Sequence, residues 1–344
     1  MTDQPTFMRA EIDEAAATLA RQLALNGERL AAIGARLRAL DPPVAVTIAR
    51  GSSDHCALYL QHLIESELAT PCASIGPSIA SLYHVRLRLN GAAAISISQS
   101  GRSPDIVETQ RAARRGGAFT IALVNEVDSP LAREAEALAP LQAGPERSVA
   151  ATKSMIAGLA AGAGLVAAWR GDETLAQALA DLPGVLAGQT APPPEAMIEA
   201  LAEVEDAFVL GRGATYAVAA EAALKLKETC AIHAEAYSSA EVLHGPAELV
   251  GPGFLIVAFM PSDAARASME SALDRLAEMG ARILKVEAGG LDGDDALAAA
   301  PAGAPVLAPI PMIHRFYGVA EALARRRGRD PDRPRNLHKV TETL

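Results

Sequence analysis

The sequence predicts an α/β protein with two tandem domains, each a mostly parallel sheet flanked by helices in an αβα sandwich. Short apolar runs alternate with stretches of helical periodicity, which is typical of a parallel sheet covered on both faces. The same alternation restarts after the proline-rich segment at residues 191–194. With 344 residues, the chain is long enough for two well-filled cores.

The first half begins with helical periodicity over residues 11–40, which a pair of prolines ends. Apolar runs at residues 44–49, 92–97 and 119–124 predict buried strands, and weaker runs at 71–75 and 137–141 suggest two more. Helices are expected at residues 55–68 and 105–115, and an alanine-rich helical region follows residue 146. We therefore expect an N-terminal helical segment at residues 1–40 and a first domain at 41–190.

The second half repeats the pattern. Strands are predicted at residues 207–210, 254–260, 282–286 and 306–309, and helices from residue 213 through 228 and at 265–279. The basic cluster at residues 325–329 is expected to be a solvated helix end. These elements assign residues 191–329 to a second domain and leave 330–344 as a proline-rich, irregular tail.

Composition and charge exclude several classes of protein. The formal net charge of -10 argues against general affinity for nucleic acid or anionic membranes. No apolar run approaches the length of a membrane span, and the polar N-terminus has no signal-peptide pattern. The three cysteines have no metal or disulfide spacing. We therefore expect a cytoplasmic protein that binds neither nucleic acid nor membrane.

Serine-rich loops follow two of the predicted strands. Ser52 and Ser53 follow the strand at 44–49, and the loop Ser98-Gln-Ser-Gly-Arg-Ser103 lies between the strand at 92–97 and the next helix. Hydroxyl groups, an amide and glycine-freed backbone N–H groups can bind a tetrahedral anion at a helix N-terminus. Ordinary turn and cap chemistry is the alternative for each loop taken singly.

A group of ionisable side chains marks the second half. Glu221, Lys225 and Glu228 are spaced to share one helix face, and His233 and His244 follow shortly after. A carboxylate beside an ammonium, with a histidine near, suits proton transfer between adjacent carbons. A solvated ion pair and ordinary loop histidines are the alternatives.

Two cofactor signals are incomplete. The segment Gly211-Arg-Gly213 begins like a dinucleotide fingerprint, but Tyr216 occupies the place of the third glycine. The histidine and carboxylate spacing matches no standard metal signature. We therefore expect neither a metal nor an organic cofactor.

With these motifs in order, the chain resembles the SIS (sugar isomerase) domain family. It is similar to the isomerase half of glutamine–fructose-6-phosphate aminotransferase (glucosamine-6-phosphate synthase) and to stand-alone SIS-type glucosamine-6-phosphate deaminases. The resemblance covers nearly the whole chain. It rests on residues 8–12, 51–53, 98–101, 144–146, 151–153, 221–228, 233–237, 244–246 and 335–339.

The resemblance implies two tandem SIS domains, a homodimer with shared active sites and a phosphorylated hexose or amino hexose as ligand. It implies catalytic roles for four residues: Glu228 as the acid/base between C1 and C2, His244 of the neighbouring subunit in ring opening, Lys225 beside the early carbons, and Lys339 of the tail as the amine that captures a ketose. The implied phosphate- and substrate-binding positions are Ser53, Ser98, Gln99, Ser100, Ser103, Val149 and Ala151, which join Ser52.

Departures from the family pattern direct the functional expectation. We expect no glutaminase domain before the first SIS domain, Ala151 replaces a serine of the synthase, and Arg102 replaces an acidic residue. The expected reaction is isomerising deamination of glucosamine-6-phosphate to fructose-6-phosphate and ammonia. The alternatives are another amino-sugar phosphate deaminase, a fructosamine-phosphate deglycase, an aldose–ketose isomerase or, less expected, a non-catalytic phosphosugar sensor.

Overall fold

The structure is a computed structural model that describes residues 5–339. These residues form two compact units. Residues 17–146 and 153–180 make up the β1–β5 unit, and residues 5–16, 147–152 and 181–339 make up the β6–β10 unit. Each unit contains one five-stranded sheet and is described by itself below.

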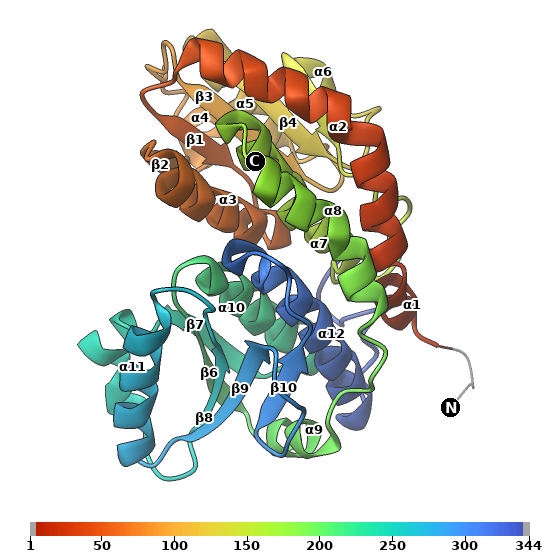
Figure 1. Cartoon of the computed structure of the whole chain (residues 1–344), viewed down its shortest axis with the longest axis vertical. Coiled ribbons are helices and arrows are strands. Elements are labelled where there is room, and N and C mark those ends of the chain that lie inside the picture. The colour runs from red at the N-terminus through yellow and green to blue at the C-terminus, as the bar shows by residue number, and fades with distance from the viewer. Residues whose placement is uncertain (1–4, 340–344) are drawn as a thin grey trace. The chain divides into compact units, whose positions relative to one another are not determined.

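The β1–β5 unit contains a sheet in which every strand pair is parallel, in the order β2-β1-β3-β4-β5. Its elements, with α8 continuing into the other unit, are α2 (Ala15–Leu40), β1 (Ala45–Ile48), α3 (Ser52–Leu68), β2 (Cys72–Ser74), α4 (Ser78–Ser81), β3 (Ala93–Ser98), α5 (Pro104–Arg115), β4 (Phe119–Val124), α6 (Pro130–Glu134), β5 (Ala137–Pro140), α7 (Lys153–Arg170) and α8 (Glu173–Ala187). Figure 1 shows the strands between helices.

The strands at the centre of this sheet are apolar because both faces are covered. Every residue of β1, β3 and β4 is buried, as expected for parallel strands inside an α/β layer. Helices α5 and α6 pack on one face, where Ile106, Val107 and Leu131 join the sheet residues in one core cluster. On the other face, Cys56 of α3 contacts Met155 of α7. The serine-rich loops therefore extend from a rigid base.

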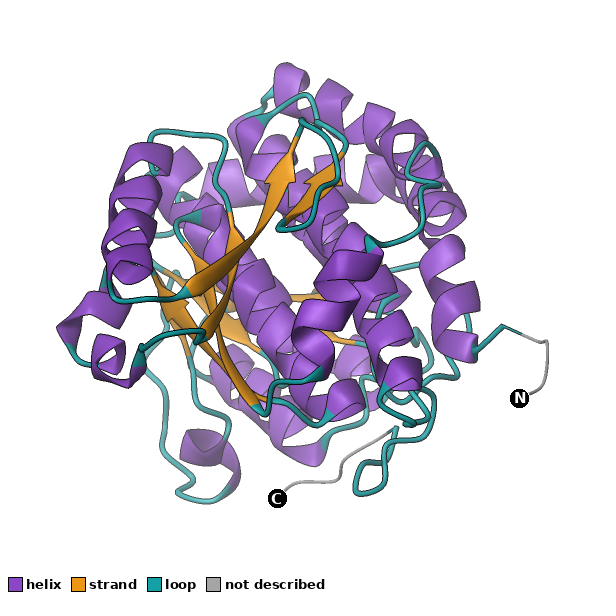
Figure 2. Ribbon diagram, turned by 90° about the horizontal axis from the view of Figure 1, so that it is seen from below, coloured by secondary structure: helices purple, strands orange, loops and turns teal. Residues whose placement is uncertain are grey.

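The β6–β10 unit repeats this topology with a second all-parallel sheet in the order β10-β9-β8-β6-β7. Figure 2 draws the strands of both sheets in orange. Numbered from its first strand, this order is again 2-1-3-4-5. The elements are α1 (Phe7–Asp13), α9 (Glu195–Ala202), β6 (Asp206–Gly211), α10 (Ala214–Lys225), η1 (Leu226–Cys230), β7 (His233–Ser238), η2 (Glu241–His244), η3 (Pro246–Leu249), β8 (Leu255–Phe259), α11 (Arg266–Glu278), β9 (Arg282–Ala288), β10 (Ala296–Ala299), η4 (Pro305–Leu307) and α12 (Pro309–Arg326).

The predicted fold class is confirmed, and three local predictions differ from the structure. The strand expected at 306–309 is wrong, because Pro305 and Pro309 open the helices η4 and α12, whose first turns need no proline N–H. Strands β7 and β10 were not predicted. The N-terminal helix is interrupted at Glu14, which separates α1 from α2.

Candidate active site

The two serine-rich loops lie side by side at the carboxyl edge of the first sheet. The strand order places the topological switch point between β1 and β3, where open α/β sheets bind ligands. Ile48 of β1 is in register with Ser96 of β3, so the loops leave the sheet next to each other. The structure therefore brings Ser52 and Ser53 close to the loop at residues 98–103.

Glycines give these loops their shape. Gly51 has φ of 57° and ψ of -136°, and it places Ser52 and Ser53 in the first turn of α3. Gly101 has φ of 61°, and a Cβ there would lie 2.2 Å from the Ser129 Oγ atom. A side chain at Gly101 would therefore displace the loop.

Most of the predicted phosphate-binding side chains in these loops are accessible. Gln99, Ser100 and Ser103 are partly exposed, while Ser98 is buried. The Gly101 N–H donates to Ser98 Oγ at 2.9 Å. Ser103 is the N-cap residue of α5 and makes no side-chain cap bond there. Hydroxyl groups at the start of α3 and α5 can thus face an anion in the positive end of two helix dipoles.

An ion pair joins the two loop regions. The Arg50 Nε atom donates to Asp105 Oδ2 at 3.1 Å, and Asp105 is fully buried in the first turn of α5. Arg50 follows β1, so the pair links the exits of β1 and β3. We regard these two residues as the support of the loop geometry.

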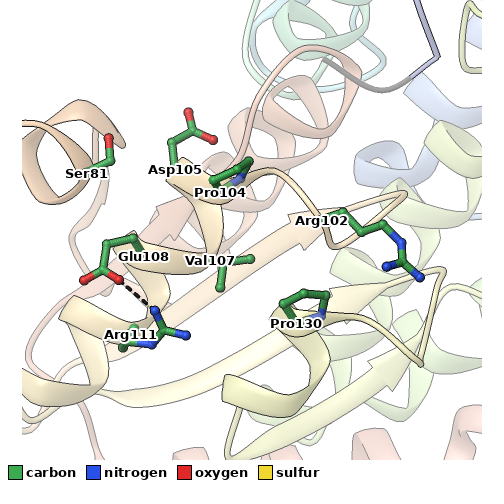
Figure 3. A pocket seen from close by; sticks show the side chains of 8 residues that line it. All are labelled: Ser81, Arg102, Pro104, Asp105, Val107, Glu108, Arg111 and Pro130. Atoms are coloured by element: carbon green, nitrogen blue, oxygen red, sulfur yellow. Dashed lines mark hydrogen bonds and ion pairs between the residues drawn. The ribbon is translucent and has the colours of Figure 1, made fainter. Parts of the chain in front are cut away.

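A cavity of about 420 Å³ opens beside the second loop (Figure 3). Arg102 lines it from the loop itself, and Glu108 and Arg111 line it from α5, joined by an ion pair of 2.8 Å. None of the sequence-predicted binding residues lines this cavity. It neighbours the candidate phosphate site without being that site.

The acidic and basic side chains predicted in the second half do come together. Lys225 is fully buried, and its Nζ atom lies 3.3 Å from Glu221 Oε1 and 2.5 Å from Glu228 Oε2. Tyr317 of α12 donates from its hydroxyl group to Glu221 Oε1 at 3.1 Å. The Glu221 and Lys225 side chains are inaccessible, whereas Glu228 is 21% exposed. Glu228 is therefore the member of this trio that solvent or a ligand can reach.

Electrostatics keep this lysine charged. Burial alone favours the neutral amine, but the attraction of Glu221 and Glu228 outweighs it and raises the pKa of Lys225 above its usual value. A charged Lys225 offsets one of the two carboxylates, and its bond to Oε2 orients the Glu228 side chain.

Glu228 lies on a π-helical turn. The α-helix α10 ends at Lys225, and η1 continues as a π-helix through Cys230 before Ala231 ends it at φ of 50°. Single π-turns are rare and frequently occur at functional sites. The Arg327 guanidinium donates to the Cys230 carbonyl at 3.0 Å and helps to fix the end of this turn.

His244 lies at the opposite end of the second sheet from Glu228. The π-helix leads directly into the start of β7, whereas His244 follows the end of β7 on an exposed 3-10 turn. The six residues of β7 span roughly 17 Å. Within one chain, the structure therefore does not bring His244 together with Glu228 and Lys225.

The remaining predicted residues lie in the tail and in the segment at residues 147–152. Lys339 of the tail donates from Nζ to the Ser148 carbonyl at 2.7 Å. The Val149 N–H donates to the Asp332 carbonyl at 3.2 Å, so the tail also contacts the segment that carries Val149 and Ala151. The tail thus contacts Ser148 and Val149, and Ala151 lies two residues further along the same segment of the β6–β10 unit.

Sequence reasoning did not single out the supporting residues Arg50, Asp105, Glu11 and Asp332. Glu11 had a usable signal, because it lies between Met8 and Ile12 on the apolar stripe of a helix. A charge in such a position needs a specific partner.

Two further findings concern the described residues. Within residues 5–339, no helix has the length and apolar character needed to cross a membrane. That part of the chain also contains no group of three or more His, Cys, Asp or Glu side chains placed to hold a metal ion.

Comparisons with known proteins give matches over most of the chain. The model of the SIS domain family matches residues 43–168 and 200–286. Glutamine–fructose-6-phosphate aminotransferase (isomerizing) of Methanothermobacter thermautotrophicus is 35% identical, over 85% of this chain and 50% of that protein. The chain thus spans about half the length of this curated relative.

Solved structures are also similar. A proposed phosphosugar isomerase from Silicibacter pomeroyi is 44% identical, with a TM-score of 0.90 over 95% of this chain and 100% of that one. Glucosamine-6-phosphate deaminase from Thermotoga maritima is 21% identical, with a TM-score of 0.76 over 98% of this chain and 100% of that one, which shows a shared fold. The two matched segments cover most of both sheets, and the chain belongs to the SIS domain family.

Proposed function

We propose that this protein is a phosphosugar-converting enzyme that catalyses the isomerising deamination of glucosamine-6-phosphate. The products are fructose-6-phosphate and ammonia, and the reaction consumes one water. The observation that carries the proposal is the buried Lys225 ammonium bonded to the one accessible carboxylate of its trio, Glu228, on a π-helical turn.

The proposed chemistry begins with ring opening by His244, which exposes the C1 aldehyde. Glu228 then removes the C2 proton, the electron pair forms a C1–C2 double bond, and the C1 oxygen takes up a proton to become an enol. Return of the first proton from Glu228 to C1, with loss of one proton from the nitrogen, gives a C2 imine. Water adds to this imine, the C2–N bond breaks, and ammonia leaves behind the C2 ketone. A single carboxylate can serve as base and then as acid because the proton moves between neighbouring carbons.

The phosphate end of the substrate is assigned to the loops of the β1–β5 unit. Ser52, Ser53 and the loop at 98–103 present hydroxyl, amide and N–H groups at the start of two helices. Binding energy from a distant phosphate helps to position the reacting carbons. Lys339 is proposed to capture the C2 carbonyl of the open-chain product ketose: its amine adds with loss of one water, and one water hydrolyses this imine again when the ketose leaves.

The position of His244 favours a homodimer with shared sites. His244 and Glu228 lie at opposite ends of β7, so one copy does not supply both groups to one sugar by this geometry. An exposed His244 can instead reach the site of a second copy. The proposed enzyme is therefore active only as a dimer.

The cysteines favour release of ammonia over its transfer from glutamine by these residues. Hydrolysis of a glutamine amide commonly uses an accessible thiolate, and all three cysteines are buried. Burial raises the pKa of the Cys72 thiol to about 12 and that of Cys230 to about 11. Three buried thiols outside any disulfide also fit a cytoplasmic location.

The same residues suit a second candidate, deamination or deglycation of a related amine-bearing hexose phosphate. Glu228 acts on C1 and C2, and nothing in this step depends on the configuration of the other hydroxyl groups. A phosphosugar sensor is disfavoured by the cost of keeping Glu221 and Lys225 buried and paired without a catalytic use.

Ammonia release from glucosamine-6-phosphate, measured together with fructose-6-phosphate, tests the proposal. Equal amounts of both products are expected, and their loss in Glu228→Gln with the melting temperature retained would support the assigned base. Thermal stabilisation by the sugar phosphate without turnover would move the assignment to another amine substrate or a sensor. The absence of both turnover and thermal stabilisation would reject the substrate class.

A further inference from the structure

The backbone of Ser148, in the β6–β10 unit, is held from both sides. The Ser148 N–H donates to Glu11, at 3.4 Å to Oε1 and 3.3 Å to Oε2, and the neighbouring Arg147 N–H also donates to Oε1. The carbonyl of the same residue accepts the Lys339 ammonium at 2.7 Å. A continuous chain of hydrogen bonds therefore runs from helix α1 to the tail lysine.

The tail is fixed by a second set of contacts. Both carboxylate oxygens of Asp332 accept backbone N–H groups at the start of α1, from Phe7 and Met8, at 2.7 Å each. The Asp332 carbonyl accepts the Val149 N–H, and Ser148 Oγ donates to the Pro331 carbonyl at 3.5 Å. Helix α1, residues 147–149 and the tail therefore hold one another in place.

Helix α1 is itself attached to α12. Thr6 donates from its hydroxyl group to Glu321 Oε1 at 2.9 Å, and the His314 ring contacts the Ile12 carbonyl at 3.2 Å. Met8 and Ile12 are buried. The helix thus offers a rigid base from which the carboxylate of Glu11 reaches the peptide of Ser148.

Burial of the Glu11 carboxylate costs free energy, and its hydrogen bonds to backbone N–H groups offset that cost. Glu11 is 4% exposed, and a buried carboxylate is strongly unfavourable unless hydrogen bonds satisfy it. Backbone N–H groups that donate to a carboxylate form charge-assisted bonds, which hold the backbone at Arg147 and Ser148 in place. The Ser148 carbonyl shares its peptide group with the Val149 N–H, and the bond of that N–H to the Asp332 carbonyl polarises the Ser148 carbonyl as an acceptor for a cationic amine.

We propose that Glu11 and Asp332 are positioning residues that fix the Lys339 amine, with the peptide of Ser148 as the connecting element. The catalytic consequence rests on the proposed function, in which Lys339 captures the ketose carbonyl. The geometric consequence does not, because the position of a lysine amine can be measured without turnover.

Competitive acetylation measures that geometry. The chain has five lysines, so limiting acetic anhydride followed by peptide mass spectrometry resolves each of them. The readout is the labelling of Lys339 relative to Lys285, which is exposed. Loss of a hydrogen bond to a charged group is worth about a factor of ten, so Glu11→Ala and Asp332→Ala are each expected to raise this ratio severalfold.

Two comparisons separate positioning from loss of folding. Buried Lys153 and Lys225 must stay unlabelled, since their labelling would report unfolding. Glu14→Gln removes a charge from an exposed residue at the end of the same helix and is expected to leave the ratio unchanged. Glu11→Gln keeps one acceptor oxygen and is expected to give an intermediate ratio. Asp332→Ala keeps the test valid if Glu11→Ala fails to fold.

Activity gives the second readout. With any hexose phosphate that turns over, Glu11→Ala and Asp332→Ala are expected to lower kcat by about tenfold or more, because small displacements of a reacting group cost that much. An unchanged Lys339 ratio in folded Glu11→Ala and Asp332→Ala would overturn the positioning proposal. A raised ratio in a protein that turns over no hexose phosphate would keep it and reject the proposed function.

Discussion

The two sheets of this protein have the same strand order, yet only one carries hydroxyl-rich loops at its switch point. Gly51 after β1 and Gly213 after β6 adopt nearly identical backbones, with φ of 57° and 59° and ψ of -136° and -134°. Ser52 and Ser53 follow the first glycine, whereas Ala214 and Thr215 follow the second. The scaffold is thus repeated without its surface chemistry.

Side chains of the second unit satisfy their own loops instead. The hydroxyl group of Thr215 accepts from the Arg212 N–H at 3.0 Å and lies 2.9 Å from the Phe259 carbonyl, and Thr215 is buried. After β8, the Asp263 carboxylate accepts the Ala265 N–H at 2.9 Å, so a negative charge lies where an anion would bind. In this unit the candidate catalytic residues Lys225 and Glu228 lie instead at the C-terminal end of α10 and on the π-turn that follows it. The two copies of the fold therefore carry different side chains at corresponding positions.

The largest expected effect separates conversion from recognition. Glu228→Gln keeps the shape of the side chain and removes the base, so kcat is expected to fall by about 10²–10⁴. Inorganic phosphate should stabilise the variant against heat as much as it stabilises the original protein. The matched control is Glu278→Gln, at the exposed end of α11. Full activity in Glu228→Gln would end the assignment of this residue.

The next effect concerns stability within the second unit. Lys225→Met removes the partner of two carboxylates, and breaking a buried ion pair from one side costs about 3–5 kcal/mol of unfolding free energy. Lys227→Met is the control, because that lysine is exposed and bonds a backbone carbonyl. Urea denaturation measures both. Equal stability of the two variants would contradict the buried arrangement.

The sequence predicts the buried strands of both sheets, because a strand that is covered on both faces consists of apolar residues. Strands β1, β3, β4 and β8 are inaccessible on both faces and therefore appear as apolar runs. Strands β7 and β10 lie at sheet edges, and β7 contains His233, Glu235 and Tyr237, so neither shows such a run. Their pairing is set by neighbours in space, which residue periodicity does not show.

The candidate site divides in the same way. Spacing along one helix predicts that Glu221, Lys225 and Glu228 meet, and the contacts confirm this. Spacing does not predict the π-turn under Glu228, since the preceding residues are good α-helix formers. Nor does it predict Arg50 with Asp105 or Glu11 with Ser148, because those partners are far apart in sequence. The catalytic and binding roles of the residues themselves stay predictions.

A pH effect is expected in the second unit. His314 is buried in α12, accepts from Gln189 Nε2 at 2.9 Å, and lies 3.2 Å from the Ile12 carbonyl. Burial, partly opposed by the bond to Ile12, lowers the pKa of His314 to about 4. The unfolded chain binds this proton below pH 6.5, so stability is complete above that pH and is lost as pH falls toward 4.

The loss at pH 4 is about 3 kcal/mol if His314 acts alone. Because His314 lies in α12, the acid effect that it carries should appear in the second unit. Hydrogen exchange at pH 7 and pH 4.5 checks this by comparing α12 with β3 and β4. His314→Gln is expected to lose this part of the pH dependence, and an unchanged slope in that variant would assign it to other groups.

The smallest effect tests the contrast between the two switch points directly. Ser100→Ala removes one hydroxyl group from the candidate phosphate loop. This change should weaken binding of inorganic phosphate or a hexose phosphate by about one to two orders of magnitude, because a hydrogen bond to a charged group contributes about 1.5–3 kcal/mol. Ser262→Ala makes the same change in the corresponding loop after β8, beside the carboxylate of Asp263, and should change nothing. Calorimetric titration of both variants measures the difference. Equal weakening by Ser262→Ala would mean that the two loops share one anion-binding role. That result would contradict the expected difference between the switch points of the two sheets.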